Sequence, residues 1–234
     1  MNLFSRGWAW TLDYAYVAFW QAHGFLLRSD PEQYRTPAPG APEGKAPVLL
    51  LPGIYETWQF MRPIAHHLHQ AGHAVHVVQR MGYNRGTIED MAHLAAEHLK
   101  QHELTDVVIV AHSKGGLIGK FLLTMSGVAP RVDRLVAINT PFSGSIYAAF
   151  FLLPSIRAFS PFDRTLQRLR AEFSLNARIT SIYSRFDPHI PGGSFVDGAR
   201  NVQLDTMGHF RPIADKRVLQ EIEQAIAAGD AGTA

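Results

Sequence analysis

A serine followed by two glycines carries the most specific chemical signal in this sequence. In the run 110–116 (VAHSKGG), an apolar, strand-like segment ends at the serine and a helix-like segment begins. In that context a serine lies on a sharp turn that exposes its hydroxyl. Ala111 and Gly115, two residues before and two after it, are small, as the close crossing of strand and helix requires. The pattern predicts Ser113 as a nucleophile; the alternative is a structural turn with a serine N-cap.

A serine hydroxyl needs a histidine base, which a carboxylate in turn orients. With this kind of turn, the acid and the base follow in that order on loops after later strands. Asp187 follows the penultimate strand-like run, and His209 follows the last one. Asp163 and Asp205 compete for the acid role, but neither ends the penultimate run. Asp187 as a plain turn residue is the remaining alternative.

The negative charge of an acyl-transfer intermediate needs backbone amides held rigidly near it. One candidate is the amide of Lys114, directly after the serine. The other is Ile54, where Gly53 allows a turn after the first strand-like run. The Lys114 side chain is unexpected here, and we expect it either to favour anionic substrates or to pair with Glu56.

Short apolar runs alternate with helical patterns from residue 48 onward, as in parallel sheets covered on both faces. Thr87 and Asp90 predict a capped start for the second helix. The pattern predicts a three-layer α/β/α sandwich with a mostly parallel sheet of about six strands. The expected strands are 48–51, 74–79, 107–111, 135–139, 179–183 and 202–205, and the expected helices are 60–70, 88–101, 115–125 and 212–228.

Three parts are expected along the chain: an aromatic-rich helix in residues 1–30, a proline-rich linker in 31–47 that cannot be helix, and a main domain in 48–234. A lid-like insertion is expected at 142–173, with an ordinary crossover helix as the alternative.

The polar residues of the N-terminal segment are spread around a helix, so we expect it to bury most of its circumference. It could lie in a membrane interface, dock on its own domain or a partner, or span a bilayer. Asp13 interrupts the apolar run and no Ala-x-Ala site follows it, so a signal peptide is not convincing.

Composition excludes several classes of function. The net charge is only +2 with dispersed lysines and arginines, so no nucleic-acid partner is expected. With no cysteine, there is no thiolate metal site and no cysteine nucleophile. We expect neither a metal nor a cofactor. The histidines at 66, 67, 69 and 73 have spacings that a metal could use, but a solvated face is favoured; those at 93, 98 and 102 are expected on the surface.

From Val48 onward the sequence resembles the α/β-hydrolase superfamily, in particular small bacterial lipases and esterases of the triacylglycerol lipase type. The resemblance rests on the alanine-variant turn at 111–116, the segments around Asp187 and His209, and the loop 139–145 (NTPFSGS). The sequence departs from these lipases in having Pro52 and Phe142 where they often have histidine.

This resemblance implies carboxylic-ester hydrolysis through an acyl-enzyme without a cofactor. Ser113, Asp187 and His209 would form the triad, and the amides of Ile54 and Lys114 the oxyanion hole. The expected substrate is a small-molecule ester or lipid. The expected location is cytoplasmic, with peripheral membrane contact through the N-terminal helix as a further hypothesis.

Two other functions stay open. The same triad serves acyltransferases, thioesterases and perhydrolases, and the fold could also be kept by a non-catalytic lipid- or partner-binding protein. If the N-terminal helix only contacts membranes, deletion of residues 1–30 should leave the turnover of short soluble esters unchanged.

Overall fold

The computed structural model describes residues 3–26, 30–150 and 154–230. Its centre is a six-stranded sheet in the order β2-β1-β3-β4-β5-β6, and every strand pairing within the described residues is parallel. The strands are β1 (Val48–Leu51), β2 (Val75–Val77), β3 (Val107–His112), β4 (Val132–Ile138), β5 (Ile179–Phe186) and β6 (Arg200–Met207). The strands β1, β2 and β3 are buried along their whole length, whereas the edge strand β6 is largely accessible.

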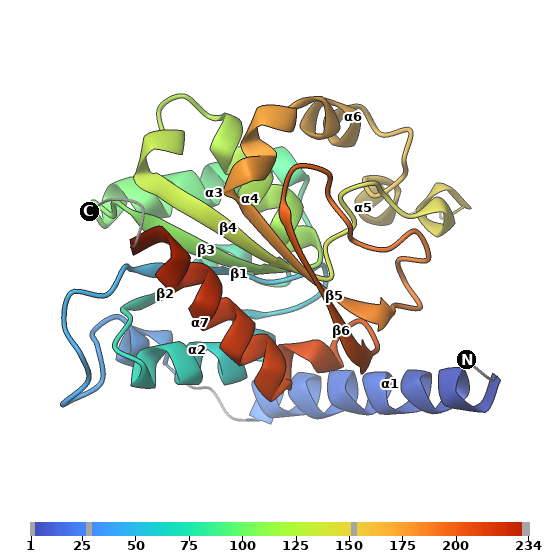
Figure 1. Ribbon diagram of the computed structural model, residues 1–234, viewed down its shortest axis with the longest axis horizontal. Coiled ribbons are helices and arrows are strands. Elements are labelled where there is room, and N and C mark those ends of the chain that lie inside the picture. The colour runs from blue at the N-terminus through green and yellow to red at the C-terminus, as the bar shows by residue number, and fades with distance from the viewer. Residues whose placement is uncertain (1–2, 27–29, 151–153, 231–234) are drawn as a thin grey trace.

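Helices cover both faces of the sheet (Figure 1). On one face lie α3 (Ile88–Gln101), α4 (Lys114–Thr124) and α6 (Arg164–Ala171), and on the other lie α2 (Arg62–Gln70) and α7 (Lys216–Asp230). Alternate residues of β3 enter the two cores: Ile109 and Ala111 face α3 and α4, while Val108 and Val110 face α2 and α7. The predicted three-layer α/β/α sandwich is confirmed.

Local signals in the sequence explain several element boundaries. The Thr87 hydroxyl accepts the amide of Asp90 at 3.0 Å, and the Asp90 carboxylate accepts the amide of Thr87 at 3.3 Å, which confirms the predicted cap of α3. The last helix begins at Lys216 rather than at Pro212, because residues 211–214 form a separate 3-10 turn, η7 (Arg211–Ala214).

The N-terminal helix α1 (Leu3–Leu26) docks along the main body below β5 and β6 (Figure 1). It packs against η7 and against the 3-10 turn η2 (Trp58–Met61). Ala9 and Asp13 are buried in this contact, whereas Trp8 is 64% exposed and Phe19 is 59% exposed. The expectation that the helix buries most of its circumference is therefore wrong: one face docks and the aromatic residues on the other face remain outside. No helix of the described residues is long and apolar enough to cross a bilayer.

The connector after α1 also differs from expectation. It contains the 3-10 turn η1 (Pro31–Tyr34), although the prolines predicted an extended, non-helical segment. The reason is local: Asp30 accepts the amide of Glu32 at 3.0 Å and Pro31 occupies the first position of the turn, where a proline is tolerated.

The described part of the segment between β4 and β5 contains four short helical elements. These are η5 (Ile146–Phe150), α5 (Pro154–Arg157), α6 and the turn η6 (Phe173–Arg178). Residues 151–153, which belong to the expected lid-like insertion, lie outside the described residues.

Two histidines expected on the surface are buried. The ring of His98 is tilted against that of His102, with centroids 4.4 Å apart, and it meets His76 edge-on at 5.6 Å. Its position on the inner face of α3 explains the error, and burial lowers the pKa of His98 to about 4. His73 lies beyond the end of α2, and its Nδ1 lies 2.8 Å from the Ala46 carbonyl.

Candidate active site

Ser113 occupies a sharp turn between β3 and α4. Its φ of 51° and ψ of −117° place it in a region that residues other than glycine rarely adopt, which costs about 1–3 kcal/mol. A Cβ added at Gly115 would lie 2.0 Å from the Leu51 carbonyl oxygen, so the start of α4 can pass the end of β1 only with glycine there. Ala111 is fully buried in β3. The small residues on either side of Ser113 thus fit the close crossing of backbones.

The three residues predicted for a catalytic triad are brought together by this fold. The Ser113 hydroxyl lies 2.9 Å from Nε2 of His209, and Nδ1 of His209 lies 2.7 Å from Oδ2 of Asp187. The other carboxylate oxygen of Asp187 accepts the backbone amides of His189 at 2.8 Å and Ile190 at 3.1 Å. One continuous hydrogen-bond chain therefore runs from a fixed carboxylate through an imidazole to a hydroxyl.

The competing acids lie elsewhere. Asp163 accepts the amide of Leu166 and caps α6, and Asp205 lies on the accessible edge strand near Arg185 and Arg217.

The charges around the imidazole perturb both members of the pair. Burial disfavours the charged form of His209, but Asp187, with smaller effects from Glu56 and Asp13, outweighs burial and raises the pKa of His209. Burial alone would raise the pKa of Asp187, yet the neighbouring His209 and the hydrogen bond from the His189 amide lower it. The carboxylate is thus charged and the imidazole is made a better proton acceptor.

The two residues predicted to supply the oxyanion donors are Lys114 and Ile54. Lys114 is the first residue of α4, a position where an amide has no acceptor within the helix. Ile54 follows the end of β1 and lines the same cavity as Ser113. The turn before it is held by the Glu56 carboxylate, which accepts the amide of Gly53 at 2.7 Å.

The Lys114 side chain does neither of the things expected of it. It is fully buried, and Nζ donates to the carbonyls of Asn84 and Gly86. Glu56 pairs instead with Nδ1 of His112 at 2.8 Å. The cation is used inside the fold to hold the loop before α3.

Two further side chains hold the backbone of the His209 loop from the sheet side. Nε2 of His112 lies 2.9 Å from the His209 carbonyl oxygen, and Nδ2 of Asn139 donates to the same oxygen at 2.9 Å. Asn139 also donates to the Gly208 carbonyl at 3.1 Å. The sequence interpretation missed the roles of both residues, although each follows or ends a strand beside the proposed nucleophile, where such partners must lie.

Ser113 and His209 open into a mostly apolar cavity of about 600 Å³. One wall comes from Trp10 and Tyr14 of α1, which the sequence analysis did not connect to the site. The Tyr14 hydroxyl lies 3.1 Å from Nε2 of His189, a ring that neighbours His209. The segment after β4 supplies the opposite wall, with Tyr147, Ala148, Ile156 and Phe159.

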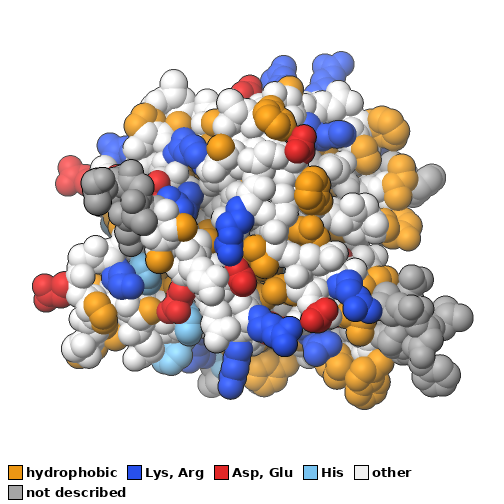
Figure 2. Space-filling model, in the orientation of Figure 1, with side chains coloured by type: hydrophobic (Ala, Val, Ile, Leu, Met, Phe, Trp, Pro, Cys, Tyr) orange, Lys and Arg blue, Asp and Glu red, His pale blue; other side chains and the backbone are white. Residues whose placement is uncertain are grey.

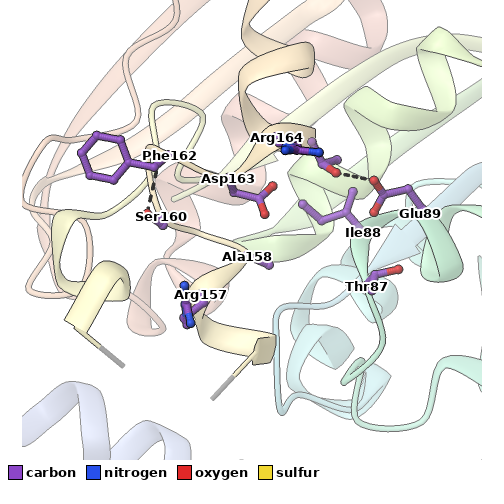
Figure 3. Close-up of a pocket in the computed structure, with 10 residues that line it drawn as sticks. Thr87, Ile88, Glu89, Arg157, Ala158, Ser160, Phe162, Asp163 and Arg164 are labelled. Carbon is purple, nitrogen blue, oxygen red and sulfur yellow. Dashed lines mark hydrogen bonds between the residues drawn. The ribbon is translucent and has the colours of Figure 1, made fainter. Parts of the chain in front are cut away.

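A second cavity, of about 790 Å³, lies between the start of α3 and the segment 157–165 (Figure 3). Its lining includes Glu89, Arg157 and Arg164, and the Thr165 hydroxyl donates to Glu89. None of the predicted catalytic residues lines it. The cavity shares no lining residue with the one around Ser113.

Among the described residues, one group has the composition and spacing to hold a metal ion: Asp187, His189 and His209, whose candidate ligand atoms lie within 4.8 Å of one another. A metal held there would compete with the hydrogen bond between Asp187 and His209. The geometry around Ser113 suits proton transfer better than metal ligation.

Residues 48–229 match the model of the alpha/beta hydrolase family. No curated protein matches the sequence.

Three similar solved structures are a lipase from Bacillus licheniformis, an enol-lactonase from Burkholderia xenovorans and a carboxylesterase from Bacillus subtilis. The lipase is 14% identical with a TM-score of 0.65, covering 82% of this chain and 96% of the lipase. The enol-lactonase is 17% identical with a TM-score of 0.58, covering 80% and 94%. The carboxylesterase is 13% identical with a TM-score of 0.53, covering 81% and 86%. At these identities the structures show the shared fold. Because the family model matches residues 48–229, which are most of the chain, the chain belongs to the alpha/beta hydrolase family.

Proposed function

We propose that this protein is a serine hydrolase that cleaves carboxylic esters through an acyl-enzyme. The observation that carries the proposal is the continuous hydrogen-bond chain from Asp187 through His209 to Ser113, with the serine at the floor of an apolar cavity. The names of the lipase and the carboxylesterase with this fold agree with ester substrates.

The geometry suggests the following sequence of steps. Oγ of Ser113 attacks the ester carbonyl carbon while its proton passes to Nε2 of His209. The tetrahedral oxyanion accepts hydrogen bonds from the amides of Ile54 and Lys114. When the intermediate collapses, the alcohol leaves with the proton from His209. A water molecule then gives a proton to His209 and attacks the carbonyl carbon of the acyl-enzyme. The acid is released, and His209 returns the proton to Oγ of Ser113.

The walls of the cavity favour an apolar acyl group. Its volume of about 600 Å³ lies within the ordinary range for small-molecule sites. Ile54, Ile156 and Phe159 line it, and its aromatic wall on α1 adds Trp10 and Tyr14. We expect the acyl chain of an ester or lipid to occupy this space.

Pre-steady-state kinetics with p-nitrophenyl butyrate would test the proposal. We expect a burst of one nitrophenolate per active protein, and a matching mass increase of one butyryl group on the peptide that contains Ser113. No burst and no acylated serine on any ester would contradict the proposal. Acylation of Ser113 by a thioester or transfer to an alcohol in preference to water would identify the transferase or thioesterase alternative.

A further inference from the structure

A buried carboxylate of the N-terminal helix reaches the loop that carries the proposed catalytic base. Asp13 on α1 has no solvent-accessible surface. Its Oδ2 accepts the amide of His209 at 2.8 Å, and its Oδ1 accepts the amides of Phe210 at 2.8 Å and Arg211 at 3.0 Å. Three consecutive backbone donors thus converge on one charged group, and hydrogen bonds to a charged acceptor are stronger than neutral ones.

These contacts complete a clamp on the His209 backbone. Its carbonyl oxygen meets Nε2 of His112 and Nδ2 of Asn139 on the sheet side, while its amide meets Asp13 on the helix side. Because these partners come from three separate elements, the backbone that sets the direction of the imidazole is fixed on both sides.

The residue before the histidine fits this close approach. Gly208 has a φ of +114°, and a Cβ added there would lie 2.6 Å from Oδ1 of Asp13. A side chain at this position would therefore push the loop and the carboxylate apart.

We infer that Asp13 is a positioning residue for His209, so that α1 is a working part of the active site. This inference rests on the proposed function, in which His209 is the base. The family match begins at residue 48, so this contact comes from a part of the chain outside the matched region.

A role limited to docking α1 predicts a different outcome from a positioning role. If Asp13 only attached the helix, any loss of docking contacts would have the same effect. Tyr16→Phe provides that comparison, because it removes the α1 hydroxyl that donates to the Phe60 carbonyl at 3.3 Å and leaves the His209 loop untouched.

The negative charge of Asp13 also affects the pKa of the His209 imidazole. Five titratable groups surround His209: Asp13 on α1, Glu56 after β1, His112 at the end of β3, and Asp187 and His189 after β5. Asp13 is one of the carboxylates that raise the pKa of His209. Asp13→Asn should therefore lower this pKa, whereas Tyr16→Phe, which removes a docking contact without a change of charge, should not.

The test compares wild type with Asp13→Asn, Tyr16→Phe and Asp205→Asn. The last variant is a charge control, since Asp205 is exposed on β6. Asparagine offers one acceptor oxygen and turns an NH₂ group toward a backbone N–H. We expect Asp13→Asn to lower kcat for p-nitrophenyl butyrate about 10- to 100-fold with KM changed less than about 3-fold, and to move the acid limb of the profile to lower pH. The two controls should stay within about 2-fold of wild type.

Gly208→Ala is a second variant, chosen because it perturbs the same contact from the loop and leaves α1 intact. It should lower kcat in the same way as Asp13→Asn. NMR titration of the His209 ring in wild type and Asp13→Asn gives a readout that does not need turnover. The positioning role would be overturned if a folded Asp13→Asn protein kept the wild-type pKa of the His209 ring and the wild-type kcat. It would also be overturned if Tyr16→Phe lowered kcat as much as Asp13→Asn does. Absence of ester turnover in wild type would instead count against the proposed function, while the ring titration would still decide the role of Asp13.

Discussion

The His209 imidazole lies beside carboxylates that come from distant parts of the chain. Asp187 makes the direct hydrogen bond, and Glu56 and Asp13 add negative charge nearby. Burial without these carboxylates would lower the pKa of the ring, but their combined effect raises it above its ordinary value of 6.5. The same charges stabilise the imidazolium that forms as Ser113 loses its proton.

A pH profile follows from this balance. Only the neutral ring can accept the proton of Ser113, so activity should fall as pH decreases through the raised pKa of His209. We expect the acid limb of kcat/KM to lie above pH 6.5 in wild type. Asp187→Asn should move this limb to lower pH and reduce kcat about 10⁴-fold. An acid limb below pH 6.5 in wild type, or one that Asp187→Asn does not move, would contradict this assignment.

The buried lysine beside the nucleophile makes a prediction about stability. Nζ of Lys114 donates to the carbonyls of Asn84 and Gly86, which lose this donor in Lys114→Met. Leaving buried acceptors unpaired costs about 1–3 kcal/mol, so the free energy of unfolding should fall by that amount in urea titrations. Lys100→Met is the matched control, because Lys100 is exposed on α3. Equal unfolding midpoints for the two variants would show that the tether does not stabilise the loop.

At the scale of elements, periodicity and turn chemistry were sufficient for the central sheet. Alternating apolar runs predicted the six strands, and the small residues around Ser113 predicted the turn that carries it. The predicted strand ends were less accurate. β6 extends from Arg200 to Met207, beyond the expected 202–205, because the accessible residues of an edge strand are often polar and give no apolar signal.

The supporting contacts could not be predicted in the same way. Asp13 and His209 are 196 positions apart, and nothing in a local pattern links them. The sequence marked Asp13 only as an interruption of an apolar segment, because the amides that satisfy it belong to another element. The buried orientation of the Lys114 side chain could not be predicted for the same reason, because its acceptors are backbone carbonyls, which have no sequence signature.

The segment between β4 and β5 should control the length of the acyl group. Ala148 is buried and lines the cavity together with Ile156 and Phe159. Ala148→Phe would fill part of this space, so we expect the optimum of a p-nitrophenyl ester series to move to shorter chains. Acetate ester turnover is the internal control and should change less than about 3-fold. A proportional loss on all esters would place the acyl chain elsewhere.

At the scale of the whole molecule, α1 has two different faces. Its inner face reaches the active site through Asp13, and its outer face exposes Trp8 and Phe19. Apolar side chains gather along the lower edge of the molecule in Figure 2, where α1 runs in Figure 1. We propose that this outer face contacts lipid, since tryptophan and other aromatic rings suit the membrane interface.

Substitutions on the outer face separate the two roles of α1. Trp8→Ala combined with Phe19→Ala should reduce co-sedimentation with phospholipid vesicles at least about 5-fold and leave p-nitrophenyl acetate turnover unchanged. Deletion of residues 1–30 is expected to lower turnover as well, because it removes Asp13; this replaces the expectation that the segment is separable from the chemistry. Unchanged vesicle binding in the double variant would contradict the proposal that this face contacts lipid.

The attack of Ser113 on esters, with His209 as its base, is tested most directly by the hydrolysis of p-nitrophenyl esters, from acetate to palmitate, by wild type and by Ser113→Ala. We expect measurable turnover by wild type and a loss on the order of 10⁶-fold in the variant, as for the removal of a triad nucleophile. Equal rates for the two proteins, or no turnover of any ester by wild type, would contradict it.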